Sequence, residues 1–140
     1  MQTRAAALAA LLILGTALSG CVKASQTDAP ATADPYAGLE AEILKWRGEI
    51  VKTDALCQSH AEGQKCDSFE VVCKAQRAIT PAEAAKGVTA KLVAGLNWNG
   101  FDTQHKQTQS VLRAAQFTRA HGVWTRAEHT SVNPESCADL

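Results

Sequence analysis

Between Tyr36 and Ile50, apolar side chains recur at intervals of three and four residues, and charged residues fill many of the positions between them. This spacing places one apolar stripe along a helix. The dipeptide Asp34-Pro35 combines a capping side chain with a proline that suits the first helical position. The pattern therefore predicts a helix that begins at Asp34-Pro35 and runs to about Leu56, with a stripe formed by Tyr36, Leu39, Ile43, Trp46 and Ile50.

After a polar stretch over residues 57–67, the period changes to two. Apolar and polar side chains alternate over residues 69–80, which predicts a strand with one buried face. The sequence Thr80-Pro81-Ala82-Glu83 resembles a capping box, so we expect a short helical turn that ends before Gly87. The side chains expected on the buried face of the strand are Phe69, Val71, Cys73, Ala75 and Ile79.

Two more strands are predicted in the next thirty residues. The first carries alternating apolar side chains over residues 92–98 and ends at a turn signal, Asn99-Gly100. The second runs from about Thr108 to Arg119. We expect a bulge in it, because its arginines fall in phase with its apolar residues and one extra residue would move them to the other face.

A hairpin at His121-Gly122 leads into a fourth strand, Val123 to Ser131. The predicted domain, residues 34–140, is therefore α+β, with one long N-terminal helix packed on a four-stranded antiparallel sheet. A single helix can cover one face of such a sheet. This layout is similar to cystatin-like and NTF2-like folds, a resemblance that concerns the fold and implies no activity.

The amino terminus has a pattern of another kind. Arg4 precedes an apolar run from Ala5 to Leu18, and two small residues come directly before Cys21. The run is short for a membrane-spanning helix. With Leu18-Ser19-Gly20-Cys21 as a lipobox, the segment resembles a bacterial lipoprotein signal. The resemblance implies that residues 1–20 are a signal peptide that is removed and that Cys21 becomes the lipidated first residue of the mature chain.

Residues 21–33 are expected to form a flexible tether, because they are rich in Ala, Thr, Ser, Asp and Pro and have no apolar period. A lipid of two or three acyl chains on Cys21 would hold the chain stably at a membrane. Val22 is not the aspartate associated with retention in the inner membrane. The resemblance thus implies an outer-membrane location facing the periplasm of a Gram-negative bacterium, with the membrane as a partner through the lipid.

Five cysteines are present, and four remain when Cys21 is set aside. An even number in an oxidising compartment predicts two disulfides, and three pairings are open. We favour Cys57–Cys66, which closes a short loop, together with Cys73–Cys137, which ties the carboxyl terminus to a strand. A zinc site is the weaker interpretation because this spacing is unusual for zinc. No metal or cofactor is predicted.

The balance of basic and acidic residues limits the classes of partner that the chain is expected to bind. The chain has 14 Lys+Arg and 14 Asp+Glu, and the predicted signal peptide removes Arg4 but no acidic residue, which leaves 13 basic and 14 acidic residues. Nucleic-acid binding calls for a basic face, so this balance argues against it. It also gives no sign of a polybasic membrane-binding segment.

None of the standard enzymatic motifs occurs, including the Gly-x-Ser-x-Gly elbow, the His-Glu-x-x-His zinc motif and the glycine-rich phosphate loop. We therefore predict a non-enzymatic module that binds a protein or an envelope polymer. Its candidate contacts are arginines and a tryptophan on neighbouring strands, where they can converge: Arg113, Arg119, Trp124 and Arg126.

Two alternatives stay open. A small-ligand-binding periplasmic domain would have a pocket between helix and sheet near Trp46 and Trp98, although core packing is the commoner role of such tryptophans. A hydrolase or isomerase would use His129, Glu128 and a carboxylate of the first helix. The remaining histidines, in loops and at a turn, are interpreted as solvated. The oligomeric state and the identity of the partner stay open.

Overall fold

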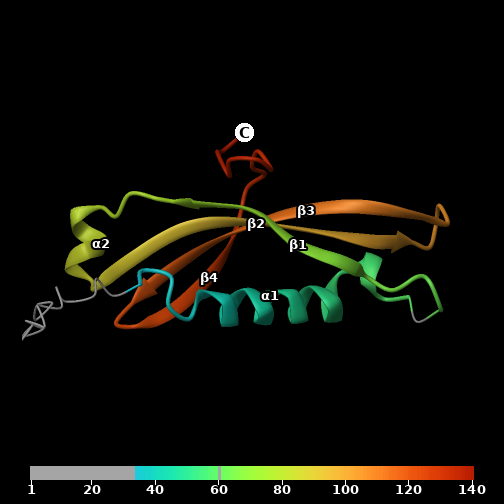
Figure 1. Ribbon diagram of the computed structural model, residues 1–140, viewed down its shortest axis with the longest axis horizontal. Helices are drawn as coiled ribbons and strands as arrows, with labels where there is room; N and C mark the ends of the chain where they lie inside the picture. The colour runs from blue at the N-terminus through green and yellow to red at the C-terminus, as the bar shows by residue number, and fades with distance from the viewer. Residues whose placement is uncertain (1–33, 60) are drawn as a thin grey trace, which may run out of the picture. The chain divides into compact units, whose positions relative to one another are not determined.

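The computed structural model describes residues 34–59 and 61–140. The predicted signal peptide, Cys21 and the tether lie outside these residues, as does His60. The elements, shown in Figure 1, are α1 (Leu39–Thr53), η1 (Ala55–Cys57), β1 (Asp67–Gln76), α2 (Pro81–Ala85), β2 (Val88–Asp102), β3 (Gln107–Ala120) and β4 (Val123–His129).

The four strands form one antiparallel sheet in the order β1-β2-β3-β4, so each strand pairs with its neighbour in sequence. In Figure 1, α1 lies along one face of this sheet and the carboxyl-terminal segment lies on the other. The fold is therefore α+β with a four-stranded antiparallel sheet, as predicted. In the described part of the chain, no helix is long and apolar enough to cross a membrane.

The main core lies between α1 and the sheet. The helical stripe Leu39, Ile43, Trp46 and Ile50 is buried against the apolar side chains that β2 and β3 turn towards it, including Leu92, Ala94, Leu96, Trp98 and Phe117. Trp46 meets Phe117 edge to face, with ring centroids 5.9 Å apart. Each large apolar side chain buried here contributes about 1.5–3 kcal/mol to folding.

A second, smaller core lies on the opposite face of the sheet. There Val93 and Ala114 pack with Val132 of the carboxyl-terminal segment, next to the Cys73–Cys137 disulfide. The other disulfide joins Cys57 to Cys66. The pairing favoured from the sequence is thus confirmed. Cys73–Cys137 fastens the carboxyl-terminal segment to β1, and Cys57–Cys66 joins η1 to the residue that precedes β1.

The helix begins and ends differently from the prediction. Residues 34–38 form turns, in which the Asp34 side chain accepts a hydrogen bond from the Tyr36 amide at 2.9 Å. α1 starts only after Gly38, whose φ of 83° is the left-handed conformation that glycine adopts cheaply. It ends at Thr53, because Asp54 leaves the helix and caps η1 instead.

The expectation that one face of β1 carries both Val71 and Cys73 is wrong. The pairing with β2 slips between these two residues, so Val72 is an extra residue in the strand. Before the slip, Val71 packs in the core beneath α1. After it, Cys73 belongs to the second core, where it reaches Cys137. The same slip carries Lys74 to the helix side of the sheet, opposite Ala94.

Two predictions for the long hairpin are also wrong. Asn99-Gly100 is not a turn, since β2 continues to Asp102 and the chain reverses only before Gln107. Gly100 instead allows close packing, because a Cβ there would lie 2.6 Å from the Leu56 Cβ. The expected bulge in β3 is absent from these described strands, whose pairing is regular from Ala90 and Arg119 to Asp102 and Gln107.

The turn predictions around α2 and before β4 are confirmed. Thr80 and Glu83 form a complete capping box, in which each side chain accepts from the other residue's backbone amide. His121 and Gly122 both have positive φ at the hairpin turn. β4 is shorter than predicted, because it ends at His129 and the chain then crosses to the second core.

Candidate functional site

The sheet register places the four predicted contact residues on one face. Arg113 lies opposite Leu96 of the core, Arg119 opposite Trp124, and Arg126 opposite Phe117. Because paired residues share a face, all four point to the side that α1 covers. The prediction that they line neighbouring strands is correct, but the face they occupy is the packed one and not a solvated one.

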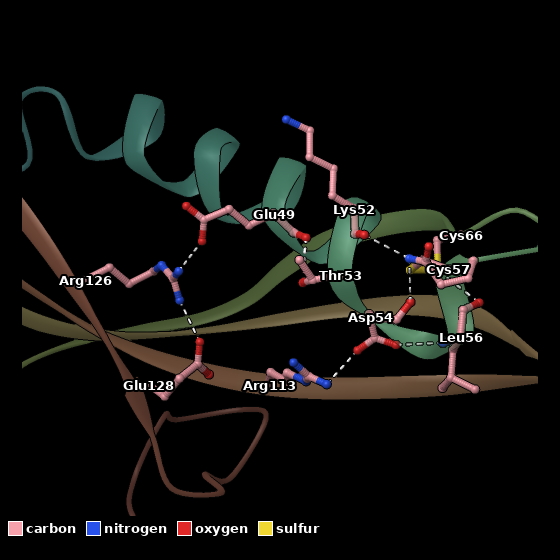
Figure 2. A network of polar contacts seen from close by, with 11 residues as sticks. Glu49, Lys52, Thr53, Asp54, Leu56, Cys57, Cys66, Arg113, Arg126 and Glu128 are labelled. Atoms are coloured by element: carbon pink, nitrogen blue, oxygen red, sulfur yellow. Dashed lines mark hydrogen bonds and ion pairs between the residues drawn. A yellow bond between two sulfur atoms is a disulfide. The ribbon is translucent and has the colours of Figure 1, made fainter.

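Arg126 joins α1 to the end of the sheet. Its guanidinium forms an ion pair with Glu49 of α1 and donates to Glu128 of β4 at 2.7 Å, as Figure 2 shows. The same group lies over the ring of Trp46, 5.7 Å from the ring centroid. Cations attract the faces of aromatic rings, so Arg126 both pairs with two carboxylates and covers the core.

Arg113 makes a similar link just beyond the carboxyl-terminal end of α1. Its guanidinium donates to Asp54 at 2.6 Å, and the second carboxylate oxygen accepts from the Leu56 amide at 2.9 Å (Figure 2). Asp54 is only 5% exposed, so its charge depends on these partners. The Arg113 side chain stays 48% exposed and is the one arginine of the set with substantial room for an outside contact.

Trp124 and Arg119 hold the turns that precede α1. Trp124 is 7% exposed, and its indole N–H donates to the Ala37 carbonyl at 2.9 Å. Arg119 is half-buried and donates to the Asp34 carbonyl at 3.5 Å. Trp124 is therefore part of the core, which corrects its assignment to a free binding surface. Together the four residues contact the turns before α1, its carboxyl-terminal half and the residue that follows it.

The histidines do not assemble the predicted catalytic alternative. His129 and Glu128 are adjacent in β4, so they point to opposite faces of the sheet, with Glu128 towards Arg126. The His129 ring lies 3.7 Å from Asp139 in the carboxyl-terminal segment. Among residues 34–59 and 61–140, no cluster of three or more metal-binding side chains occurs.

One other histidine has a defined partner. The His105 ring, in the turn between β2 and β3, lies 2.7 Å from the carboxylate of Asp102, the last residue of β2. Hydrogen bonds from the ring and from the backbone amide of His105 lower the pKa of the Asp102 carboxyl. Both groups are at the surface of a turn, where this arrangement is sufficient to shape the chain reversal.

The tryptophan pocket of the ligand-binding alternative is filled. Trp46 and Trp98 are 2% and 0% exposed, and Trp98 stacks on Phe69 with centroids 5.8 Å apart. A separate cavity of about 170 Å³ lies where the chain enters the domain, between Tyr36 and the paired ends of β1 and β2. The two cations that line it are already bound, Arg77 by Asp139 and Lys91 by Glu83.

The outer face of the sheet, away from α1, offers a polar surface. Glu70, Asn97 and Asn99 lie there on β1 and β2, and we call them the outer polar face. Asn97 accepts from the Ser110 hydroxyl at 2.9 Å, while the Asn99 side chain has no hydrogen-bond partner among the described residues.

Sequence reasoning also missed an open edge. β4 pairs with β3 only from Ala114 to Ala120, and no strand of the described ranges pairs with the outer side of residues 107–113. A hollow of about 430 Å³ lies where β4 leaves, between Leu112, Arg113, Glu128 and His129. Strand length was the signal in the sequence that could have revealed this edge, since the segment predicted for β3 was longer than the segment predicted for β4.

Comparison with known proteins gives no family. No protein-family model matches the chain, and searches of curated proteins and of solved structures find no similar protein. Function must therefore be inferred from the chain's own residues.

Proposed function

We propose that the mature chain is a lipid-anchored, non-enzymatic interaction module of the bacterial cell envelope. The observation that carries the proposal is the lipobox Leu18-Ser19-Gly20-Cys21 behind a charged and then apolar amino terminus. The lipid on Cys21 would hold the domain at the outer membrane, facing the periplasm of a Gram-negative bacterium. The tether, residues 21–33, would let the domain reach a protein or an envelope polymer.

The cysteine pairing supports this proposal. The sequence has five cysteines, and the two disulfides account for all of them except Cys21. Disulfides are typical of oxidising compartments such as the periplasm. The remaining cysteine is the one that a lipoprotein would modify.

The outer polar face is the better candidate for partner contact than the arginine set. Arg126 and Trp124 hold α1, and moving them would open the core. Glu70, Asn97 and Asn99 hold no helix, and they present amide and carboxylate groups from adjacent strands. Such groups recognise polar peptides and glycans by hydrogen bonds. Arg113, which is half-exposed, stays part of the proposed contact.

The finer fold assignment belongs to the same proposal. One helix across one face of an antiparallel meander is similar to cystatin-like and NTF2-like layouts. A likeness of layout supports a scaffold role for the helix and says nothing about the ligand. An experimental structure superposed on members of the two fold groups would test this assignment.

The lipid is tested on the protein purified from membranes. Mass spectrometry of its amino-terminal peptide should find Cys21 as the first residue, carrying diacylglycerol. Cys21→Ala should abolish this product and leave the signal uncleaved at that position. An unmodified amino terminus at another residue would overturn the anchored location.

Binding is tested by chemical cross-linking in living cells, followed by mass spectrometry of the captured partners. A discrete envelope partner is expected, and Asn97→Arg with Asn99→Arg should remove it by placing bulky charge on the outer polar face. Ala127→Arg is the matched control, since Ala127 is exposed on the same face but on β4. Equal capture by both variants would reject this face as the contact.

A further inference from the structure

The open half of β3 lacks the features that usually protect a strand edge. Its residues 107–112 include no charged residue, proline or glycine, and Arg113, the one charged residue of the open segment, is paired with Asp54 on the helix side. β1, at the opposite edge of the sheet, has two breaks in register and the charged residues Asp67, Glu70 and Lys74. Charges and bulges keep other strands from pairing at an edge. One edge of this sheet is protected and the other is available for pairing.

Side-chain contacts show which backbone groups face the open edge. The Thr125 hydroxyl of β4 donates to the Thr118 carbonyl, and the Thr89 hydroxyl of β2 donates to the Arg119 carbonyl. Even-numbered residues of β3 therefore direct their backbone towards β4 and odd-numbered ones towards β2, because these directions alternate along a strand. In the open half, the backbone groups of Thr108, Ser110 and Leu112 face outwards.

We propose that this edge pairs with the same edge of a second copy, antiparallel and centred on Ser110. In that register Ser110 lies opposite Ser110 of the second copy, and Thr108 lies opposite Leu112. These are the residues whose N–H and C=O groups point outwards, so the pairing satisfies all of them on both strands. The two sheets would join into one continuous sheet through β3.

The side chains fit a second copy of this chain. On the helix side, Gln107 would face Arg113 of the second copy and Gln109 would face Val111, so no like charges meet. Beyond the paired segment, Lys106 would reach the hollow beside β4 of the second copy, where Glu128 lies. This charge complementarity, repeated by the twofold symmetry, favours a second copy over an unrelated extended peptide.

The pairing does not depend on the lipid anchor or on the outer polar face. A contact of seven residues per chain buries a small area, so the pairing should be weak at low concentration. Attachment to one membrane surface would strengthen it by raising the effective concentration of the chains. The failure of the proposed function would thus leave this inference standing, and the reverse also holds.

The test is disulfide trapping of the full chain, expressed with its own signal and oxidised in cells and after purification. Ser110→Cys should give a disulfide-linked dimer, because facing residues of such a pair lie about 5.5 Å apart between Cα atoms, within disulfide range. Glu70→Cys, on the protected edge, is the control and should stay monomeric. Equal dimer yields from both variants would overturn the proposal.

A second measurement avoids the new cysteine. Sedimentation of the purified protein should show a dimer that grows with concentration and is lost in Ser110→Lys, which would set two lysines against each other. Ala127→Lys, exposed on β4, should keep the dimer. A concentration-independent monomer would overturn the proposal, and so would trapping of Ser110→Cys to a different protein in cells.

Discussion

Arg113 and Arg126 stand in the alternation of β3 and β4 where apolar side chains are expected, and each meets a carboxylate from the helical side of the domain. The stems of such arginines can cover apolar surface while the guanidinium reaches a charge. Sequence reasoning identified both residues as unusual. It could not identify their partners, because Glu49 and Asp54 lie more than fifty residues away and only the packing of α1 brings them close.

Arg113→Met should lower the free energy of unfolding by about 1–2 kcal/mol, because it leaves the buried Asp54 carboxylate without its cation. The half-exposed position of Arg113 keeps the loss below that of a fully buried pair. Urea unfolding measures the change. Lys45→Met breaks the exposed pair with Glu42 and should cost less than about 0.5 kcal/mol. Equal losses in the two variants would contradict the role given to burial.

Two glycines, Gly100 and Gly48, allow a second test of the packing at the scale of single residues. Gly100→Ala should destabilise the domain by about 1–3 kcal/mol, because the added Cβ would lie 2.6 Å from Leu56. Gly48→Ala is the matched control, since it meets no atom within 4 Å on α1 and should stabilise the helix by about 0.5–1 kcal/mol. Thermal unfolding of both variants measures the two opposite shifts, and a shift of the same sign in both would contradict this packing.

At the scale of elements, periodicity, the capping box and the turn signals predicted the existence and type of α1, α2 and all four strands, but not where several of them end. The Asn99-Gly100 signal failed because the sequence does not distinguish a glycine required for close packing from a glycine required for a turn. The slip at Val72 was invisible, since small apolar residues in β1 suit either face. The capping box at Thr80 succeeded because its geometry is local to four residues.

The capping box predicts a pH dependence. The hydrogen bond from Lys91, with those from Thr80, lowers the pKa of Glu83 from 4.5 to about 2. A carboxyl whose pKa is lower in the folded state stabilises that state above its ordinary pKa, and this contribution fades as the pH falls from about 4.5 to about 2.

Glu83→Gln should therefore lose stability relative to the native chain at pH 6, and the difference should shrink at pH 2–3. Melting temperatures of the two proteins across this range measure the effect. Glu135→Gln, exposed in the carboxyl-terminal segment, should show no comparable convergence. A difference that stays constant down to pH 2 would contradict the assignment to Glu83.

At the scale of the whole molecule, the sequence predicted an α+β domain and the cysteine pairing that the structure shows. It did not predict which face of the sheet would be free. That outcome depends on α1 covering one face, on the slip in β1, and on the difference in length between β3 and β4. These are long-range relations, and no local pattern of residues encodes them.

The two disulfides should differ in how much each stabilises the folded domain. In the chain-entropy account, closing the 64-residue separation of Cys73 and Cys137 contributes about 4 kcal/mol, and closing the 9-residue separation of Cys57 and Cys66 contributes about 2.5 kcal/mol. Cys73→Ala with Cys137→Ala should therefore cost more stability than Cys57→Ala with Cys66→Ala. Urea unfolding of the two double variants under oxidising conditions measures this order, and the reverse order would contradict it.

The bond between Cys73 and Cys137 also sets how the domain responds to tension. It closes a covalent ring that contains all of β2, β3 and β4. A load applied at the amino-terminal end of the domain, where the proposed anchor is attached, can draw out only the chain that precedes Cys73. The helix and the start of β1 would yield first, and the three strands inside the ring could not be pulled straight while the bond lasts.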